Sequence, residues 1–403
     1  MSVDTQTRLE NAARNPQLLV RGAFFRGSTL SSAYLTIFLS MHGLTAGQIV
    51  RLEAVIFSGF WLLWEVPSGW IADKIGHARS ILWSVPFAAV GYSCYGLSYA
   101  LWQFVLCELS IGVAQGLISG SEAALLHESL AATGQAGQEV EWQHKLLWYQ
   151  RTSYAVGAIA SLVVVHFWGV ATAMFLDGVV IACGLPLAWR LKDVAPITRQ
   201  ISSFRQSCRT FMRIPRVRAT MQLSTGLSLV TYFAVWLCAI YYQRAGLTIV
   251  LIGCWSFSRQ FILVGGQLLL RRWPWWRTFR SIRSQQTPYA TWWWLLAAIV
   301  IATLGFGLHL AWWLVPLALI FDVTRTIAKA QIDTELNRLI TGQYRASLHS
   351  VHTALQRGTF MLVGMPLQLI DARYGFQTTL LCSSGIGLIV ALYGLVRLQQ
   401  TPS

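Results

Sequence analysis

The stretch EVPSGWIADKIGHARS, from Glu65 to Ser80, separates two long apolar runs of this 403-residue chain. The run before it reads AVIFSGFWLLW, and the run after it reads ILWSVPFAAVGYSCYGLSYALW. A cluster of Asp, Lys, His and Arg side chains is unusual in a sequence that is 55% hydrophobic and only 12% charged. We interpret the stretch as a short polar connection between two membrane-embedded helices.

The composition predicts a membrane protein whose spans are helices. Water-soluble chains carry about 25% charged residues, so a chain at 12% cannot hide its apolar surface in one globule. A membrane helix needs about 20 mainly apolar residues, whereas barrel strands alternate polar and apolar residues over about 10 positions. The runs here are continuous, and a helix satisfies its own backbone hydrogen bonds in lipid.

The apolar runs predict an all-α integral membrane protein with twelve transmembrane helices. We expect them near residues 18–41, 47–70, 80–98, 102–127, 146–167, 170–189, 219–242, 248–270, 289–308, 311–330, 346–370 and 375–396. Residues 1–17 are polar and carry acids as well as arginines, so we expect no cleaved signal there. The first helix is then expected to stay in the protein.

The basic residues predict the orientation of the chain. The formal net charge is +15, and the basic residues concentrate in the middle connection and in the connection after the eighth helix. By the positive-inside rule, both termini and the middle connection are predicted to face the cytoplasm. A plasma membrane, such as a bacterial inner membrane, is the expected location. Anionic lipid headgroups are the expected partners of the basic loops, and nucleic acid is not.

The two halves of the chain repeat each other. WYQRTSYAVG in the fifth helix matches ALQRGTFMLVG in the eleventh, so Gln150 and Arg151 recur as Gln356 and Arg357. FWGVATA and RYGFQTT occupy corresponding places after them. A parallel repeat of two halves occurs in secondary transporters that bind substrate between the halves. The predicted domains are a six-helix half, a basic cytoplasmic linker and a second six-helix half, at residues 1–189, 190–218 and 219–403.

The opening stretch also resembles a known signature. GWIADKIGHAR has the form Gly-x-x-x-Asp-Lys-x-Gly and lies between the second and third helices, which is similar to the signature loop of the major facilitator superfamily. EVPSG, SGSEAALLHESL and NRLITGQYRASLHS resemble stretches found in one subgroup of that family. The resemblance implies the twelve-helix fold of a secondary transporter that works by alternating access.

The resemblance further implies a gate. Its residues are Glu65, Gly69, Asp73, Lys74, Gly76 and Arg79 in the loop, with Arg151 and Arg357 on the fifth and eleventh helices. We expect Pro67 and Gly69 to end the second helix, and Asp73 to face a helix N-terminus, where negative charge is favoured. The sequence departs from the family at His77 and Ala78, which stand where a basic pair is common. The fourth helix also lacks the arginine found in many drug antiporters.

Charges inside the predicted spans indicate the expected site. At about 1.5 Å of rise per residue, Arg26, Arg259 and Asp322 lie near mid-membrane. An ionisable group is costly there and is a candidate for function, with a structural ion pair or snorkelling to the interface as the alternative. The family resemblance implies that the first, fourth, seventh and tenth helices line the cavity. The expected substrate-binding residues are Arg26, Arg259, Asp322, Arg325 and Tyr232. Because guanidinium groups bind carboxylate and phosphate well, we expect an anionic or zwitterionic organic solute.

Two carboxylates are candidates for proton coupling, since a carboxylate buried in a span is able to take up a proton near physiological pH. Glu108 is the first candidate, and it starts a column with Gly112, Gly116 and Gly120 on one helix face. Asp322 is the second, although Arg325 one turn away is placed to neutralise it as a salt bridge.

Other chemistries are not expected. The seven cysteines show no metal or redox spacing, and His349 and His352 have no acidic or thiol partner nearby, so we expect no metal and no cofactor. Glycine loops for ATP and paired-carboxylate motifs are absent, which argues against an ATP-driven pump and a lipid-modifying membrane enzyme. We expect a monomeric transporter rather than an enzyme, coupled to protons or another ion. Drug or metabolite efflux by proton antiport is the open alternative.

Overall fold

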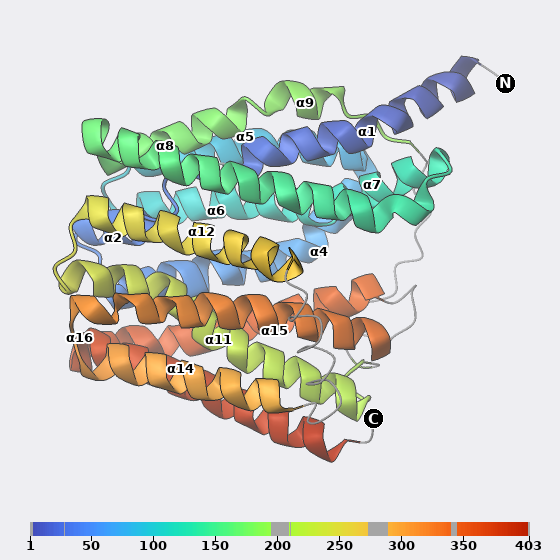
Figure 1. Cartoon of the computed structure of the whole chain (residues 1–403). Helices are drawn as coiled ribbons and strands as arrows, with labels where there is room; N and C mark the ends of the chain where they lie inside the picture. Colours follow the sequence, from blue (N-terminus) through green and yellow to red (C-terminus); the bar gives the residue numbers. More distant parts are fainter. Residues whose placement is uncertain are drawn as a thin grey trace. The chain divides into compact units, whose positions relative to one another are not determined.

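The computed structural model describes residues 3–27, 29–194, 209, 211–272, 289–339 and 345–401, and every regular element in them is a helix (Figure 1). The first elements are α1 (Val3–Gly27), α2 (Leu35–Met41), α3 (Ala46–Val50), the π-helix η1 (Arg51–Phe57), α4 (Ser58–Ile75), α5 (His77–Gly96), α6 (Leu101–Ser119), α7 (Ser121–Ala132), η2 (Ala136–Gln138), α8 (Glu139–Ala182) and α9 (Leu185–Arg190). The later elements are α11 (Pro215–Arg244), α12 (Ile249–Arg272), α14 (Ala290–Leu308), the 3₁₀-helix η3 (Trp312–Leu317), α15 (Ala318–Leu339) and α16 (Arg345–Gln400).

Contacts divide these helices into two compact units. Unit 1 comprises Met1–His42 and Ile56–Gln200, and unit 2 comprises Gly43–Val55 and Ile201–Ser403. The segment 43–55 belongs to unit 2 because its backbone binds α16: the Gly47 N–H donates to Asp371 Oδ2 at 2.8 Å. The predicted boundaries at residues 189 and 218 stay a prediction, since residues 195–208 of the linker lie outside the described part.

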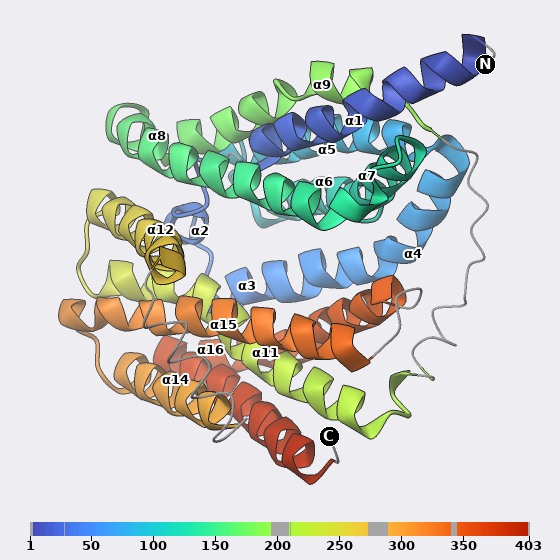
Figure 2. The same ribbon diagram turned by 45° about the vertical axis from the view of Figure 1, so that its right-hand side comes forward.

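Each unit is a bundle of long helices. In unit 1, α5 packs against α6 and α8, and α1 runs along α8. Leu19, Ile81 and Leu125 from three of its helices meet in one buried apolar cluster. In unit 2, α11 packs against both α15 and α16, and these three helices lie side by side in Figures 1 and 2.

Six described helical segments are long and apolar enough to cross a membrane: Ala46–Glu65, Leu101–Ala132, Glu141–Arg190, Pro215–Arg244, Ala290–Leu308 and Val351–Gln400. Large apolar side chains stay exposed along them, including Leu63 at 76% and Phe167 and Ile389 at 69%. Hydrocarbon is the natural environment of such a surface. The predicted all-α membrane architecture is confirmed, whereas the number of twelve helices stays a prediction.

Two glycines at corresponding places of the repeat bend the longest helices. Gly169 has φ 83° and ψ 172° within α8, and Gly375 has φ 81° and ψ 175° within α16. This backbone region is essentially restricted to glycine. The turn separates the fifth predicted helix from the sixth, and the eleventh from the twelfth. The match between FWGVATA and RYGFQTT therefore reflects the same bend in both halves.

A second element of the repeat escaped the sequence analysis. The tripeptide Gly-Leu-Thr at 43–45 recurs at 246–248, and both glycines have positive φ, at 82° and 88°. Each threonine hydroxyl then accepts a hydrogen bond from the backbone N–H three residues further on, at 3.2 and 3.4 Å. Both threonines thus begin a helix as N-caps.

The first predicted helix, residues 18–41, is wrong as a continuous segment. The helix α1 already begins at Val3 and ends at Gly27, and α2 starts only at Leu35. Between them, the backbone N–H groups of Leu30 and Ser31 donate to the carboxylate of Asp177 in α8. Because this carboxylate replaces helical carbonyl acceptors, the backbone leaves the helix without losing its hydrogen bonds.

The predicted end of the second helix at Pro67 and Gly69 is also wrong. The helix α4 continues through both residues and ends at Gly76, whose φ is 96°. Before α4, residues Arg51–Phe57 form a π-helix, a rare form that often occurs at functional sites. The tenth helix differs as well, because it opens with the 3₁₀ turns of η3, which contain Pro316.

We predict that Gly375→Ala lowers the free energy of unfolding by about 1–3 kcal/mol, the cost of a non-glycine residue in this backbone region. Gly385→Ala is the matched control, since its added Cβ meets no atom within 4 Å and its φ lies outside the positive range. Thermal unfolding of the purified protein in detergent measures both. Equal stability of the two variants would contradict the assigned bend.

Candidate functional site

A polar cavity of about 160 Å³ lies in unit 2 between α11, α15 and α16. Its lining residues are Ser224, Leu227, Ser228, Thr231, Tyr232, Arg325, Ala328, Lys329, Ile332, Asp333, His352, Thr353 and Gln356. Helical periodicity explains this lining, because residues three and four apart share one helix face. Ser224 and Ser228 on α11, Arg325 and Lys329 on α15, and His352 and Gln356 on α16 are three such pairs.

One wall of the cavity is a hydrogen-bonded network between α11 and α16. The Gln356 amide donates to Ser224 Oγ at 2.9 Å and to Ser228 Oγ at 2.8 Å. His352 Nε2 lies 2.8 Å from Ser224 Oγ and 3.1 Å from Gln356 Nε2. These serine, histidine and glutamine side chains donate and accept hydrogen bonds, so the wall is able to orient a polar solute.

The opposite wall of the cavity carries the charge. The guanidinium of Arg325 lies 5.0 Å from the centre of the Tyr232 ring, in a cation–π contact. Lys329 and Asp333 form an ion pair of 3.2 Å, whereas Arg325 forms no ion pair with any described residue. The lining therefore has one more cation than anion, and that cation is Arg325.

A buried ion pair lies beside this wall. Arg259 Nε in α12 is 2.8 Å from Asp322 Oδ2 in α15, and Arg259 Nη1 donates to Tyr242 Oη at 3.1 Å. The two charged side chains are only 16% and 15% exposed. We expected Arg325 to neutralise Asp322, but the salt bridge joins Asp322 to Arg259. Arg325 is left to face the cavity.

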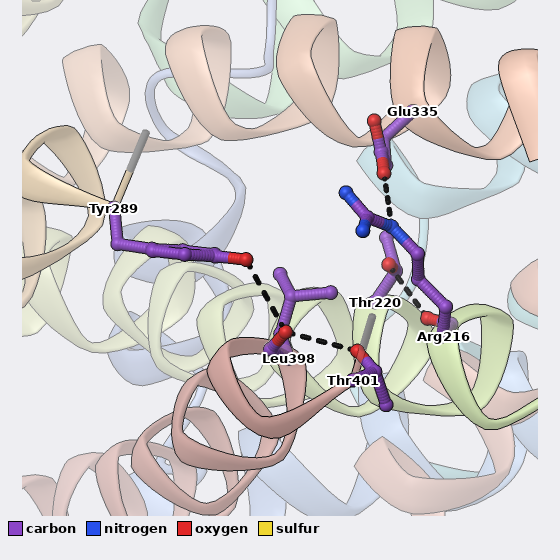
Figure 3. A network of polar contacts seen from close by, with 6 residues as sticks. All are labelled: Arg216, Thr220, Tyr289, Glu335, Leu398 and Thr401. Atoms are coloured by element: carbon purple, nitrogen blue, oxygen red, sulfur yellow. Dashed lines mark hydrogen bonds and ion pairs between the residues drawn. The ribbon is translucent and has the colours of Figure 1, made fainter. Parts of the chain in front are cut away.

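Polar contacts also fix the ends of the cavity helices (Figure 3). Arg216 Nε in α11 donates to Glu335 Oε1 in α15 at 2.8 Å. The Tyr289 hydroxyl, at the start of α14, donates to the carbonyl of Leu398 in α16 at 3.3 Å, and Thr401 donates to the same carbonyl at 2.9 Å. The first bond joins α11 to α15, two walls of the cavity, and the second joins the start of α14 to α16.

In unit 1, two predicted site residues already have partners. Arg26, in the last turn of α1, forms an ion pair with Glu122 of α7. Glu108 in α6 accepts a hydrogen bond from the Tyr95 hydroxyl of α5, and only 4% of it is exposed. The sequence offered no sign of the pairing of Arg26 with Glu122, because the two residues lie 96 positions apart. The proton-coupling role expected of Glu108 stays a prediction.

The sequence analysis missed Asp177, which is completely buried in α8. It accepts the backbone N–H of Ser31 at 3.0 Å and that of Leu30. The signal was available, because a lone carboxylate stands in the apolar run TAMFLDGVVIA. The depth argument applied to Arg26 would have selected it.

In the predicted gating loop, the carboxylate at the N-terminus of α5 is that of Asp193 and not, as we expected, that of Asp73. The backbone N–H of Ala78, in the first turn of α5, donates to Asp193 Oδ1 at 2.9 Å. A Cβ on Gly76 would collide with that same carboxylate. The expectation that Asp73 faces a helix N-terminus is therefore wrong for α5, since among the described residues Asp73 has no hydrogen-bond partner. Its role as a cytoplasmic lock stays a prediction.

Other gate residues are dispersed around this loop. Lys74 lies 3.8 Å from the centre of the Trp70 ring, Arg79 is exposed, and His77 Nε2 lies 3.6 Å from Glu128 Oε1. Glu65 is partly buried and Gly69 is exposed. Of the two gate arginines on the fifth and eleventh predicted helices, Arg151 is exposed. Arg357 is partly buried and follows the cavity residue Gln356 in the sequence. The side chain of His349 lies outside the described residues.

Comparisons with known proteins agree with this architecture. No family model matches the chain. Multidrug resistance protein MdtG of Dickeya zeae (strain Ech586) is 27% identical over 118 residues, which cover 28% of this chain and 29% of that protein. The chain thus matches less than a third of that relative's length.

Solved structures match over nearly the whole chain. The POT family transporter PepTSo has a TM-score of 0.76 at 11% identity, with 96% of this chain and 98% of that chain covered. The nucleoside transporter NupG has a TM-score of 0.69 at 11% identity, with 96% of this chain and 98% of that chain covered. A bacterial homologue of the human lysosomal transporter Spinster has a TM-score of 0.67 at 13% identity, with 100% of this chain and 98% of that chain covered.

The helical bundles and these matches define a multi-pass membrane protein. Its fold is that of the major facilitator superfamily, as the family resemblance implied. The signature motif in the loop between α4 and α5 itself stays a prediction.

We predict that Asp322→Asn destabilises the protein by about 2 kcal/mol, because it leaves the charge of Arg259 without its partner in a mostly buried place. The double variant Arg259→Gln with Asp322→Asn should lose less, since it leaves no unpaired charge. Lys329→Gln, at an exposed pair, should change stability by less than about 0.5 kcal/mol. Thermal unfolding in detergent measures all three, and a double variant no more stable than Asp322→Asn would refute the pair.

Proposed function

We propose that this protein is a secondary active transporter that moves a small anionic or zwitterionic organic solute by alternating access. The observation that carries the proposal is the cation Arg325, which faces a polar cavity without an acidic partner among the described residues. A guanidinium in that position binds a carboxylate or phosphate through charge-assisted hydrogen bonds. The fold supports the mechanism, because transporters of this fold alternate between two access states around a fixed site.

The size of the cavity favours a small solute. A cavity of about 150 Å³ holds a molecule the size of benzene, and the cavity in unit 2 measures about 160 Å³. One amino acid, a small organic acid or the end group of a short peptide fits such a volume. The serine, histidine and glutamine wall would bind the uncharged polar groups of the same solute, and Tyr232 would cover its apolar side.

We propose proton coupling through Asp322, with Glu108 as the second carrier. Protonation of Asp322 removes its charge and weakens the ion pair with Arg259, so the helices α12 and α15 lose a contact that exists in one state only. A ligand or proton shifts a conformational equilibrium only through such differential contacts. By the same reasoning, we propose that the ion pair of Arg26 and Glu122 in unit 1 breaks and re-forms during the transport cycle.

Proton-coupled efflux of drugs or metabolites is the second candidate. The partial match to a multidrug resistance protein favours it. The polar lining of the cavity and the departures from the drug-antiporter pattern favour the first candidate. We propose a bacterial inner membrane as the location, with both termini in the cytoplasm. Measured turnover in detergent without any gradient would instead support an enzyme.

We predict that the purified protein in proteoliposomes accumulates labelled solutes from a panel of amino acids, short peptides and organic acids when a pH gradient is imposed. A protonophore should abolish the accumulation. Arg325→Gln should raise the apparent KM about 10-fold or more, since a charged hydrogen bond contributes about 1.5–3 kcal/mol. Arg218→Gln, at an exposed site of α11, is the charge-matched control and should behave as the parent. Equal KM values for both variants would exclude Arg325 from the site.

A further inference from the structure

A second basic site lies in unit 1, in an open pocket of about 610 Å³ between the N-terminal part of α1 and the end of α9. Its lining residues are Asn11, Arg14, Gln17, Leu18, Arg21, Trp189, Arg190 and Lys192. All four charged side chains among them are cations. The pocket is not used by the transport mechanism proposed above.

Helical spacing brings together the lining residues that belong to α1. Asn11, Arg14, Leu18 and Arg21 follow one another by three or four residues along α1, so they lie on one face of the helix. The side chains of Arg14 and Arg21 are exposed, while Leu19 and Val20 between them are buried in the core of unit 1. The arginines are thus held outward from a fixed helix.

The buried side-chain amide of Asn15 attaches the segment that carries Arg190 and Lys192 to α1. Asn15 is only 1% exposed, and its Nδ2 group donates to the carbonyl of Lys192 at 2.8 Å and to Ser129 Oγ at 2.9 Å. Its Oδ1 atom accepts the backbone N–H of Lys192 at 3.3 Å. Leu191, 5% exposed, is buried in the same apolar cluster. The segment is therefore fixed on α1 with Arg190 and Lys192 exposed beside the two arginines.

Four cations held together without an acid repel one another, so this arrangement favours an anionic ligand. We propose that the pocket binds the phosphate of an anionic membrane lipid. The location supports a lipid, because the candidate span Glu141–Arg190 ends in this pocket. Trp189, 72% exposed at its rim, has the amphipathic ring that is enriched at membrane interfaces. Basic pockets between membrane helices bind lipid headgroups of this kind.

The test uses the full-length protein in neutral detergent, with native mass spectrometry and thermal unfolding as readouts. The probes are phosphatidylglycerol, phosphatidylcholine and inorganic phosphate. We expect phosphatidylglycerol to bind and to raise the unfolding temperature, and the other two probes to do neither at the same concentration. Arg14→Gln with Arg21→Gln should weaken phosphatidylglycerol binding about 30-fold, since each basic residue near an anionic lipid contributes about fivefold.

The matched control removes two exposed cations outside the basic loops, as Arg244→Gln with Arg373→Gln in unit 2, and should bind as the parent does. Lys192→Gln is a second test variant that leaves α1 unchanged, and it should weaken binding about fivefold. Equal loss in the control would overturn the proposal, as would equal binding of phosphatidylcholine. If inorganic phosphate bound tightly and phosphatidylglycerol did not, the ligand would be a free anion and the lipid proposal would be wrong. Retained transport in the variants separates this site from the proposed solute cavity.

Discussion

The carboxylate of Asp177 accepts backbone N–H groups at the break between α1 and α2, in a part of unit 1 that excludes water. Lipid offers no hydrogen-bond partners to such groups, so the protein itself must supply them. Two further helix starts follow the same rule: Asp193 accepts from the first turn of α5, and Asp371 from the first turn of α3. A negative charge at a helix N-terminus contributes about 0.3–2 kcal/mol, depending on burial. Asp193 and Asp371 thus stabilise the first turns of α5 and α3, and Asp177 holds the backbone between α1 and α2.

Acidic side chains are scarce in this protein, with 16 Asp and Glu against 31 Lys and Arg. Some of them are committed to helix starts, and others to ion pairs such as Arg26 with Glu122 and Arg259 with Asp322. Cations therefore remain without acidic partners in two pockets of the described chain. One is Arg325 in the cavity of unit 2, and the other is the basic pocket of α1 and α9. The same imbalance of charge thus underlies the proposed solute site and the proposed lipid site.

The sequence predicted the all-helical membrane fold because apolar runs of about 20 residues have few other solutions. Depth in the spans singled out Arg259 and Asp322, and the family resemblance singled out the helices that carry Arg325 and Tyr232, which line the cavity of unit 2. The sequence missed contacts between residues far apart in the chain. The pairing of Asp322 with Arg259 rather than Arg325 depends on the packing of α12 against α15. The helix break at Leu30 depends on a carboxylate 147 positions later, so no local pattern in residues 18–41 announces it.

The central claim is that Arg325 makes the cavity of unit 2 selective for anionic groups. The most direct measurement is the thermal stabilisation of the purified protein by solutes offered in pairs, each carboxylate beside its own amide. The pairs differ in one charged group and share size and shape. The account predicts that carboxylates raise the unfolding temperature, that their amides do not, and that Arg325→Gln removes the difference. Equal stabilisation by carboxylates and amides, or a preference that survives Arg325→Gln, would contradict it.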